Sequence, residues 1–293
     1  MAFRFKRKES IAAGFARLVE EQIGDAVAAL EKSADKGVHE ARKCIKRVRS
    51  LLRLFRKAMP DGSYERENDA LRTVAHSLAS LRDAQVRMRV FDSVAWGIKV
   101  PGAARARRSL FAEFKSAAAG SSNPSPVQSG ITMLRTIAAR LPGLKPDSGW
   151  SVLSRGLKTT YRRARKTHAA ARAEPSTAAI HAWRRRSKDF EYQMQLLRKI
   201  DPSAMKRCIR TARKLNDFLG DDHDLAVLTR SLTAARDLPG ELRRRLSERI
   251  ERRRKKLQRR AFAAGSELFF EKPGVVVKEL GRRWKRWKKG NDQ

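Results

Sequence analysis

The sequence has few of the features that define several common classes of protein. It contains only two cysteines, Cys44 and Cys208, which lie far apart and outside any Cys-x-x-Cys motif. This excludes a disulfide scaffold and a thiolate zinc site. No apolar run reaches the ~18 residues that a membrane-spanning helix needs, and the basic start of the chain lacks the apolar stretch of a secretory signal. We therefore expect a soluble, cytoplasmic protein without a membrane span.

Acidic residues are also scarce. The 293 residues include 31 Asp and Glu against 67 Lys and Arg, which gives a formal net charge of +36. The excess positive side chains repel one another in the compact state, and this repulsion destabilises the folded protein. A protein with such a charge usually meets a polyanion, and composition alone leaves DNA, RNA, anionic lipid and inorganic polyphosphate open. The apolar content of 41% is still sufficient for a hydrophobic core.

Alternating strand patterns are absent, whereas Ala, Leu, Arg, Lys and Glu recur with apolar residues at three- and four-residue steps. Helix breakers divide the chain at intervals that suit helices of ordinary length. These breakers are Pro60–Gly62, Val100–Gly102, Gly120–Pro126, Pro142–Gly143, Glu174–Pro175, Asp201–Pro202, Gly220–Asp221, Pro239–Gly240 and Pro273–Gly274. The pattern predicts an all-α fold with a linker at 120–126 and a joint at 142–149.

The two parts of the chain resemble each other at an offset of 142 residues. Val38–Lys46 aligns with Ile180–Lys188, and Gly14 aligns with Gly156. After a slip of one residue, Arg72 matches Arg213, Leu78 matches Leu219, Asp83 matches Asp224 and Val86 matches Val227. We interpret this as a duplication, with a basic tail at 1–8, a first helical half at 9–141 and a second at 149–289. A pseudo-twofold axis between the halves would follow.

The repeated helix, at about 35–58, carries two stripes. The apolar stripe, which predicts a core-facing side, consists of Val38, Ala41, Ile45, Val48, Leu52, Phe55 and Met59. The adjacent basic stripe consists of His39, Arg42, Lys46, Arg49, Arg53 and Arg56, and its copy holds His181, Arg184, Lys188 and Arg198 but is interrupted by Glu191 and Gln195. A solvated helix face usually mixes signs. The basic stripe therefore favours phosphate binding, for which Arg and Lys are suited.

The repeated histidines lie near the starts of their helices, four residues after Asp35 and Thr177, which are good N-cap types. Free backbone N–H groups at a helix start suit phosphate, and a bound anion would favour imidazolium. A histidine beside an apolar stripe is just as often a packed interior imidazole. The sequence leaves both roles open for His39 and His181.

These motifs form a recognisable pattern. Val38-His39-x-x-Arg42-Lys43-x-x-Lys46-Arg47-x-Arg49, its copy at His181, and Leu-Gly-Asp-Asp-His-Asp-Leu at 219–225 resemble the CHAD family, the conserved histidine α-helical domain, over about residues 9–289. The resemblance implies two four-helix bundles around a basic central channel that binds inorganic polyphosphate, and an association with polyphosphate granules. Carried onto this sequence, the channel residues are His39, Arg42, Lys43, Lys46, Arg49, Arg53, His181, Arg184, Arg185 and Lys188, with Arg72 and Arg213 added because they match between the halves.

The second copy departs from the first at Ser187, Asp189 and Glu191, which suggests that the first half binds more strongly. Some CHAD domains follow a triphosphate-hydrolysing CYTH domain, whose Glu-x-Glu-x-Lys signature does not occur here. We therefore expect a stand-alone binding module without catalysis, metal or cofactor. The sequence does not indicate the oligomeric state.

Two rival interpretations rest on other motifs. Asp221-Asp222-His223-Asp224 resembles a metal-binding dyad of helical phosphohydrolases, but that chemistry needs further ligands, and a simpler role for Asp224 and Asp83 is to cap or brace helix starts. The basic run 243–260 and the tail 282–289, with Trp284 and Trp287, favour non-specific nucleic-acid binding. We expect the two tryptophans, three residues apart on a helix, to be packing anchors.

Overall fold

The computed structural model describes residues 3–118, 125–144, 149–235 and 238–290, without the side chains of 34–36, 80–85, 106, 113–115, 117 and 118. Within these residues the chain is helical and contains no strand, which confirms the all-α prediction. The helices are α1 (Ile11–Lys32), α2 (Ala34–Phe55), α3 (Ser63–Ser77), α4 (Ala79–Ala95), α5 (Ala103–Ala118), α6 (Pro126–Arg140), α7 (Trp150–Ala173), α8 (Thr177–Leu196), α9 (Pro202–Ala234), α10 (Gly240–Phe269) and α11 (Pro273–Lys289), with short 3₁₀ turns at Arg56–Ala58 and Leu141–Gly143. No described helix is both long and apolar enough to cross a bilayer.

Most helix ends coincide with the expected breakers. Proline occupies the first turn of α6, α9 and α11, where its missing N–H costs nothing. The side chain of Ser176 accepts a hydrogen bond from the Ala179 N–H at 3.2 Å and caps α8. The expectation that Thr177 caps this helix is therefore wrong by one residue, because Thr177 is already helical. The expected cap Asp35 lies outside the side chains that the structure describes.

The predicted break at Gly220–Asp221 is wrong, because α9 continues through it to Ala234. Glycine inside a helix costs about 1 kcal/mol, but Leu219 and Leu225 on either side are buried and their packing offsets that cost. Asp224 consequently lies in the middle of α9 and caps no helix start. Asp83, the counterpart of Asp224 in the first half, was expected to have the same role, but its side chain is not among those that the structure describes.

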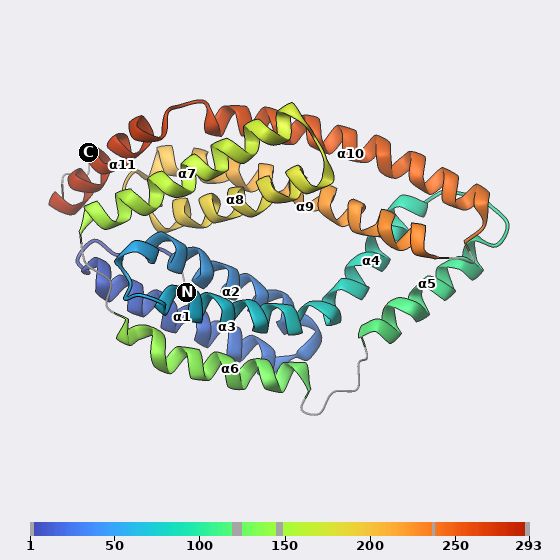
Figure 1. The fold of residues 1–293 in the computed structure, drawn as a ribbon, viewed down its shortest axis with the longest axis horizontal. Helices are drawn as coiled ribbons and strands as arrows, with labels where there is room; N and C mark the ends of the chain where they lie inside the picture. Colours follow the sequence, from blue (N-terminus) through green and yellow to red (C-terminus); the bar gives the residue numbers. More distant parts are fainter. Residues whose placement is uncertain (1–2, 119–124, 145–148, 236–237, 291–293) are drawn as a thin grey trace.

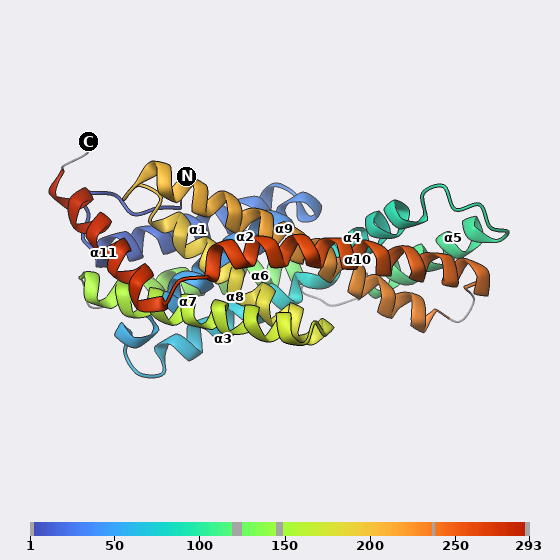
Figure 2. The same cartoon turned by 90° about the horizontal axis from the view of Figure 1, so that it is seen from above.

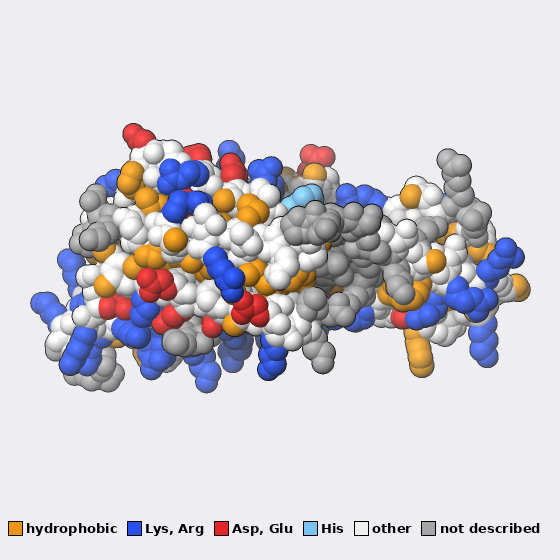
Figure 3. All heavy atoms as spheres, turned by 90° about the horizontal axis from the view of Figure 1, so that it is seen from below, with side chains coloured by type: hydrophobic (Ala, Val, Ile, Leu, Met, Phe, Trp, Pro, Cys, Tyr) orange, Lys and Arg blue, Asp and Glu red, His pale blue; other side chains and the backbone are white. Residues whose placement is uncertain are grey.

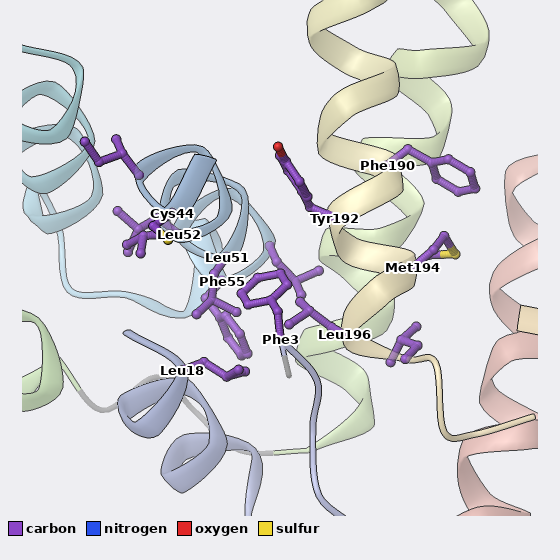
Figure 4. Close-up of a cluster of buried hydrophobic side chains, with 14 of the residues drawn as sticks. Phe3, Leu18, Cys44, Leu51, Leu52, Phe55, Phe190, Tyr192, Met194 and Leu196 are labelled. Carbon is purple, nitrogen blue, oxygen red and sulfur yellow. The ribbon is translucent and has the colours of Figure 1, made fainter. Parts of the chain in front are cut away.

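The main hydrophobic core joins helices from both predicted halves. Phe15 and Phe55 pack edge to face with ring centroids 5.1 Å apart, and the apolar stripe of α2 is buried as its periodicity predicts. In Figure 4, Tyr192 and Leu196 point from α8 towards α2, whereas Phe190 and Met194 point to the other side of α8. Helix α8 thus buries side chains on both sides and occupies the middle of this part of the molecule.

A second core lies at the other end of the elongated molecule (Figures 1 and 2). It joins α4 and α5 to the end of α9 and the start of α10 through Met88, Phe91, Val94, Leu110, Leu228, Leu232, Leu242 and Leu246. Elements of the two predicted halves therefore share both cores. The boundary between the halves and the pseudo-twofold axis stay predictions.

Direct polar contacts also join the two repeated helices. The Ser50 hydroxyl donates to the Asp189 carbonyl at 3.2 Å, and the Gln193 amide donates to the Ser50 carbonyl at 3.2 Å. Helix α7 crosses α2 very closely at Gly156, where a Cβ atom would lie 2.1 Å from the Leu54 carbonyl oxygen. The position requires glycine because any side chain would collide with the α2 backbone.

Candidate anion-binding site

The basic row of α2 lies along α3. Arg42 Nη1 donates to the Ala75 carbonyl at 2.5 Å, and Arg49 Nε donates to the Asn68 side-chain oxygen at 3.1 Å. Burial and the nearby Arg53 lower the pKa of the Arg49 guanidinium. These contacts hold the row in place between α3 and the rest of the bundle.

The corresponding row of α8 lies along α9 instead. Lys188 Nζ pairs with Glu191 at 2.8 Å, and the Asn216 amide donates to the same carboxylate at 3.0 Å. Arg213 Nε lies 3.7 Å from Glu191. Figure 2 places α3 and the N-terminal part of α9 on opposite sides of the molecule. The two basic rows therefore follow different neighbours along most of their length.

Acidic residues that interrupt the second row neutralise some of the predicted binding residues. Asp189 is 8% exposed and accepts a hydrogen bond from Arg53 at 2.8 Å, and Arg186 lies 3.9 Å away. Burial raises the pKa of the Asp189 carboxyl, although Arg53, Arg186 and Arg49 act against that rise. Glu191, which is 3% exposed, forms an ion pair with Lys188 in the same way. Arg53 and Lys188 are consequently committed to ion pairs.

A pair of histidines marks the place where α8 and α9 meet. His181 Nδ1 lies 3.2 Å from His223 Nδ1, so one imidazole donates a proton to the other and at least one ring is neutral. Burial, Arg185, Arg184 and Arg230 lower the pKa of His181. The pKa of His223 is lowered to about 4, first by burial and then by the nearby side chains of Arg184, His181, Arg230 and Lys46.

We call the group Lys46, His181, Arg184, Arg185, His223 and Arg230 the histidine cluster. The side chains that lower the pKa of its two imidazoles most, besides burial, are cationic. Arg184 is mostly buried, its pKa is lowered by that burial although Asp224 opposes the shift, and its Nε has no hydrogen-bond partner among the described residues. The cluster brings the α2 and α8 rows together through Lys46 and the three predicted α8 residues.

The remaining predicted residues lie apart on the surface. His39 is exposed, with its Nε2 4.0 Å from Glu40, and Lys43 pairs with the same carboxylate at 2.6 Å. Arg72 is exposed on α3, 3.8 Å from Asp69. Surface ion pairs of this kind contribute little stability, so their cations stay accessible to a stronger anion.

Comparisons with known proteins concern the family and the fold of the chain. A family model described as the CHAD domain matches residues 15–233. The chain belongs to the CHAD family. The fold of this CHAD domain is similar to the "Crystal structure of the CHAD domain from the plant Ricinus communis", with 18% identity, a TM-score of 0.63 and coverage of 96% of this chain and 95% of that chain.

A second similar structure is "PptA from Streptomyces chartreusis", with 15% identity, a TM-score of 0.60 and coverage of 90% of this chain and 100% of that chain. At these identities the likeness concerns the fold alone. A search of the curated proteins found no match.

Two residues of the histidine cluster in this CHAD domain escaped the sequence analysis. His223 was assigned to a metal motif, and Arg230 was not singled out. The signal that could have found them is their spacing, because residues seven positions apart lie on one side of a helix.

The acidic motif beside His223 has a structural role in this CHAD domain. Asp222 is 2% exposed and accepts hydrogen bonds from Arg254 Nε at 3.0 Å and from Gln258 Nε2 at 2.9 Å. It therefore joins α9 to α10. Among the described residues, no group of three His, Cys, Asp or Glu side chains could hold a metal ion.

The basic residues of α10 and α11 are partly used in packing. Trp284 and Trp287 are 5% and 6% exposed, which confirms that they are packing anchors. Arg249 donates to the Val94 carbonyl at 3.0 Å, and Arg253 donates to the Ser93 carbonyl at 3.1 Å. Figure 3 shows the face opposite to α10 and α11, where acidic, basic and apolar side chains are mixed over the described residues.

Proposed function

We propose that this CHAD domain binds inorganic polyphosphate without catalysis, and that the histidine cluster is the centre of the binding site. The observation that carries the proposal is the gathering of Lys46, Arg184, Arg185 and Arg230 around the hydrogen-bonded His181–His223 pair. A site without a ligand strains under the repulsion between these cations, and a chain of phosphates would relieve it. The family resemblance supports the same ligand.

Binding follows from many charge-assisted contacts. Arg184 and Arg185 offer forked donors that suit phosphate oxygens, and Lys46 offers a compact charge. Each phosphate that is neutralised releases counterions, so the affinity should fall steeply with salt, as it does for nucleic acids. We include in this proposal a continuous channel that both basic rows line. Lys46 is the residue of the α2 row that lies at the histidine cluster.

The test is a competition at ~150 mM salt, near physiological screening. Long-chain polyphosphate carrying a fluorescent end label is displaced either by unlabelled polyphosphate or by duplex DNA of equal charge. We expect polyphosphate to be at least ten times the better competitor. A preference for DNA would replace the proposal with nucleic-acid binding. Phosphate release from polyphosphate in the presence of Mn²⁺ would contradict the absence of catalysis.

A charge-matched pair of variants locates the site. The cluster variant carries Lys46→Gln, Arg185→Gln and Arg230→Gln, whereas the control carries Arg252→Gln, Lys255→Gln and Arg259→Gln on exposed positions of α10. Both remove three positive charges, so general attraction falls equally. We expect the cluster variant to weaken polyphosphate binding at least tenfold more than the control. Equal losses would place the site elsewhere.

A further inference from the structure

A basic cavity whose lining contains none of the histidine-cluster residues lies between the N-terminal segment, α2, the end of α8 and the start of α9. It has a volume of about 710 Å³ and is lined by Phe3, Arg4, Arg47, Gln195, Arg198, Lys199, Pro202, Lys206, Ile209, Arg210, Arg213, Lys214 and Asp217. We call it the α9 pocket. Eight of these residues are Lys or Arg and one is acidic. Arg198, just past the end of α8, lies roughly 25 Å from His181 at 1.5 Å per residue, whereas Asp217 at the other end of the pocket lies roughly 9 Å before His223 on α9.

The walls of the α9 pocket are fixed by contacts that do not use its free cations. The Phe5 N–H donates to the Leu196 carbonyl at 3.0 Å, and Phe3 is 4% exposed. Figure 4 shows Phe3 beside Leu196 and Phe55 between α2 and α8. The Arg47 guanidinium lies 5.4 Å from the centre of the Phe3 ring. The N-terminal segment is thus part of a built pocket.

Five cations of the α9 pocket have no internal role. Within the described part of the chain, no hydrogen bond or ion pair is formed by the side chains of Arg198, Lys199, Lys206, Arg210 and Lys214. All five are exposed. Like charges gathered in this way destabilise a free protein, so folding alone does not account for them.

The first half of the chain provides an internal comparison. At the offset of 141, Lys206, Arg210 and Lys214 correspond to Glu65, Asp69 and Thr73. The cavity beside Glu65, about 650 Å³ between the end of α2, the start of α3 and α7, also contains Asp61, and Arg56 there pairs with Glu65 at 2.7 Å. The helix in the first half therefore folds with two acidic residues and one neutral residue at these positions, and the second copy has three basic residues instead.

We infer that the α9 pocket is a second anion site, separate from the histidine cluster, that binds a compact group of closely spaced phosphates. Arginine forks and lysine ammonium groups around one cavity match phosphate oxygens that point in several directions. The ligand is either a short phosphate oligomer or a segment of a longer polyphosphate. The inference rests on the proposed function only for the class of ligand.

The test uses calorimetric titration with tripolyphosphate and, in a second arm, with long-chain polyphosphate. The pocket variant carries Arg198→Gln, Arg210→Gln and Lys214→Gln. Its matched control carries Lys57→Gln, Arg155→Gln and Arg163→Gln in the first-half cavity. We expect the pocket variant to lose tripolyphosphate binding at least tenfold, whereas the control changes it less than threefold; the cluster variant is compared in the long-chain arm. Because the three pocket residues are exposed, the variant should keep its Tm, and Arg210→Gln alone provides a milder version.

The possible outcomes separate the two proposals. Tripolyphosphate binding that is the same in the pocket variant and its control would overturn this inference, even where the cluster variant loses long-chain binding. Tripolyphosphate binding that depends on the pocket, combined with long-chain binding that does not depend on the cluster, would overturn the proposed function and retain this inference. Long-chain binding that weakens in both variants indicates that one chain reaches both sites.

Discussion

At the scale of single residues, the His181–His223 pair makes stability depend on pH. Both pKa values are lowered in the folded protein, that of His223 from 6.5 to about 4. Between pH 6.5 and pH 4, His223 is protonated in the unfolded chain but neutral in the folded protein. The contribution of this histidine to the free energy of unfolding is therefore fully present above pH 6.5 and is lost as the pH falls towards 4. We expect the free energy of unfolding in urea to decrease by about 1–2 kcal/mol between pH 7 and pH 5, after allowance for partial exposure.

The variant His223→Gln provides the control, because it keeps a polar side chain but cannot titrate. Its stability should change less between pH 7 and pH 5 than that of the natural protein. Identical pH profiles would show that other groups cause the loss. A bound phosphate chain favours imidazolium, so polyphosphate should reduce the acid loss in the natural protein.

Asp189 supports a second prediction at this scale. Its carboxylate pairs with Arg53, which belongs to the predicted binding row. Asp189→Asn removes the charge at constant size and leaves Arg53 unpaired, which should destabilise the fold by about 3–5 kcal/mol and strengthen polyphosphate binding. Thermal unfolding and titration measure the two effects. The exposed pair Arg107–Asp92 supplies the control, because Asp92→Asn should change both quantities little. Weaker binding by Asp189→Asn would mean that Arg53 serves packing alone.

At the scale of helices, the crossing of α7 over α2 depends on Gly156. A Cβ atom there would lie 2.1 Å from a backbone oxygen, which cannot rotate away. Gly156→Ala should therefore destabilise the protein by about 1–3 kcal/mol or more. Gly24 in α1 is the matched control, since a Cβ atom at that position meets nothing within 4 Å. Gly24→Ala should stabilise the protein by about 1 kcal/mol, and chemical denaturation compares the two directly.

How far the sequence predicted these helices depended on the range of the interactions involved. The apolar stripe of α2 is local, and its burial from Val38 to Phe55 is confirmed. The path of α9 through Gly220 depends on leucines that pack against other helices, which the local pattern does not contain. The pairing of Arg53 with Asp189 and of His181 with His223 joins residues far apart in the chain. Periodicity predicts the side of a helix on which a residue lies, but not the partner it meets there.

At the scale of the whole molecule, the net charge of +36 should make salt and polyphosphate act in opposite ways. Salt screens the repulsion between cations, so the Tm of the free protein should rise with NaCl. Polyphosphate stabilises the folded state by binding it, by about 2.7 kcal/mol at a hundredfold excess over Kd. This corresponds to a rise in Tm of roughly 4 °C for a chain of this size. Salt weakens that binding, so the rise caused by polyphosphate should shrink as NaCl increases.

Scanning calorimetry over a grid of NaCl and polyphosphate concentrations measures both trends. Orthophosphate at equal ionic strength is the control, since it screens charge but cannot bridge many cations. We expect orthophosphate to follow the NaCl curve and polyphosphate to depart from it most at low salt. If the two phosphates gave the same Tm at equal ionic strength, the charge would act only through screening. A departure that disappears in the cluster variant but persists in the α10 control assigns the stabilisation to the histidine cluster, where Lys46 of α2 joins cations of α8 and α9.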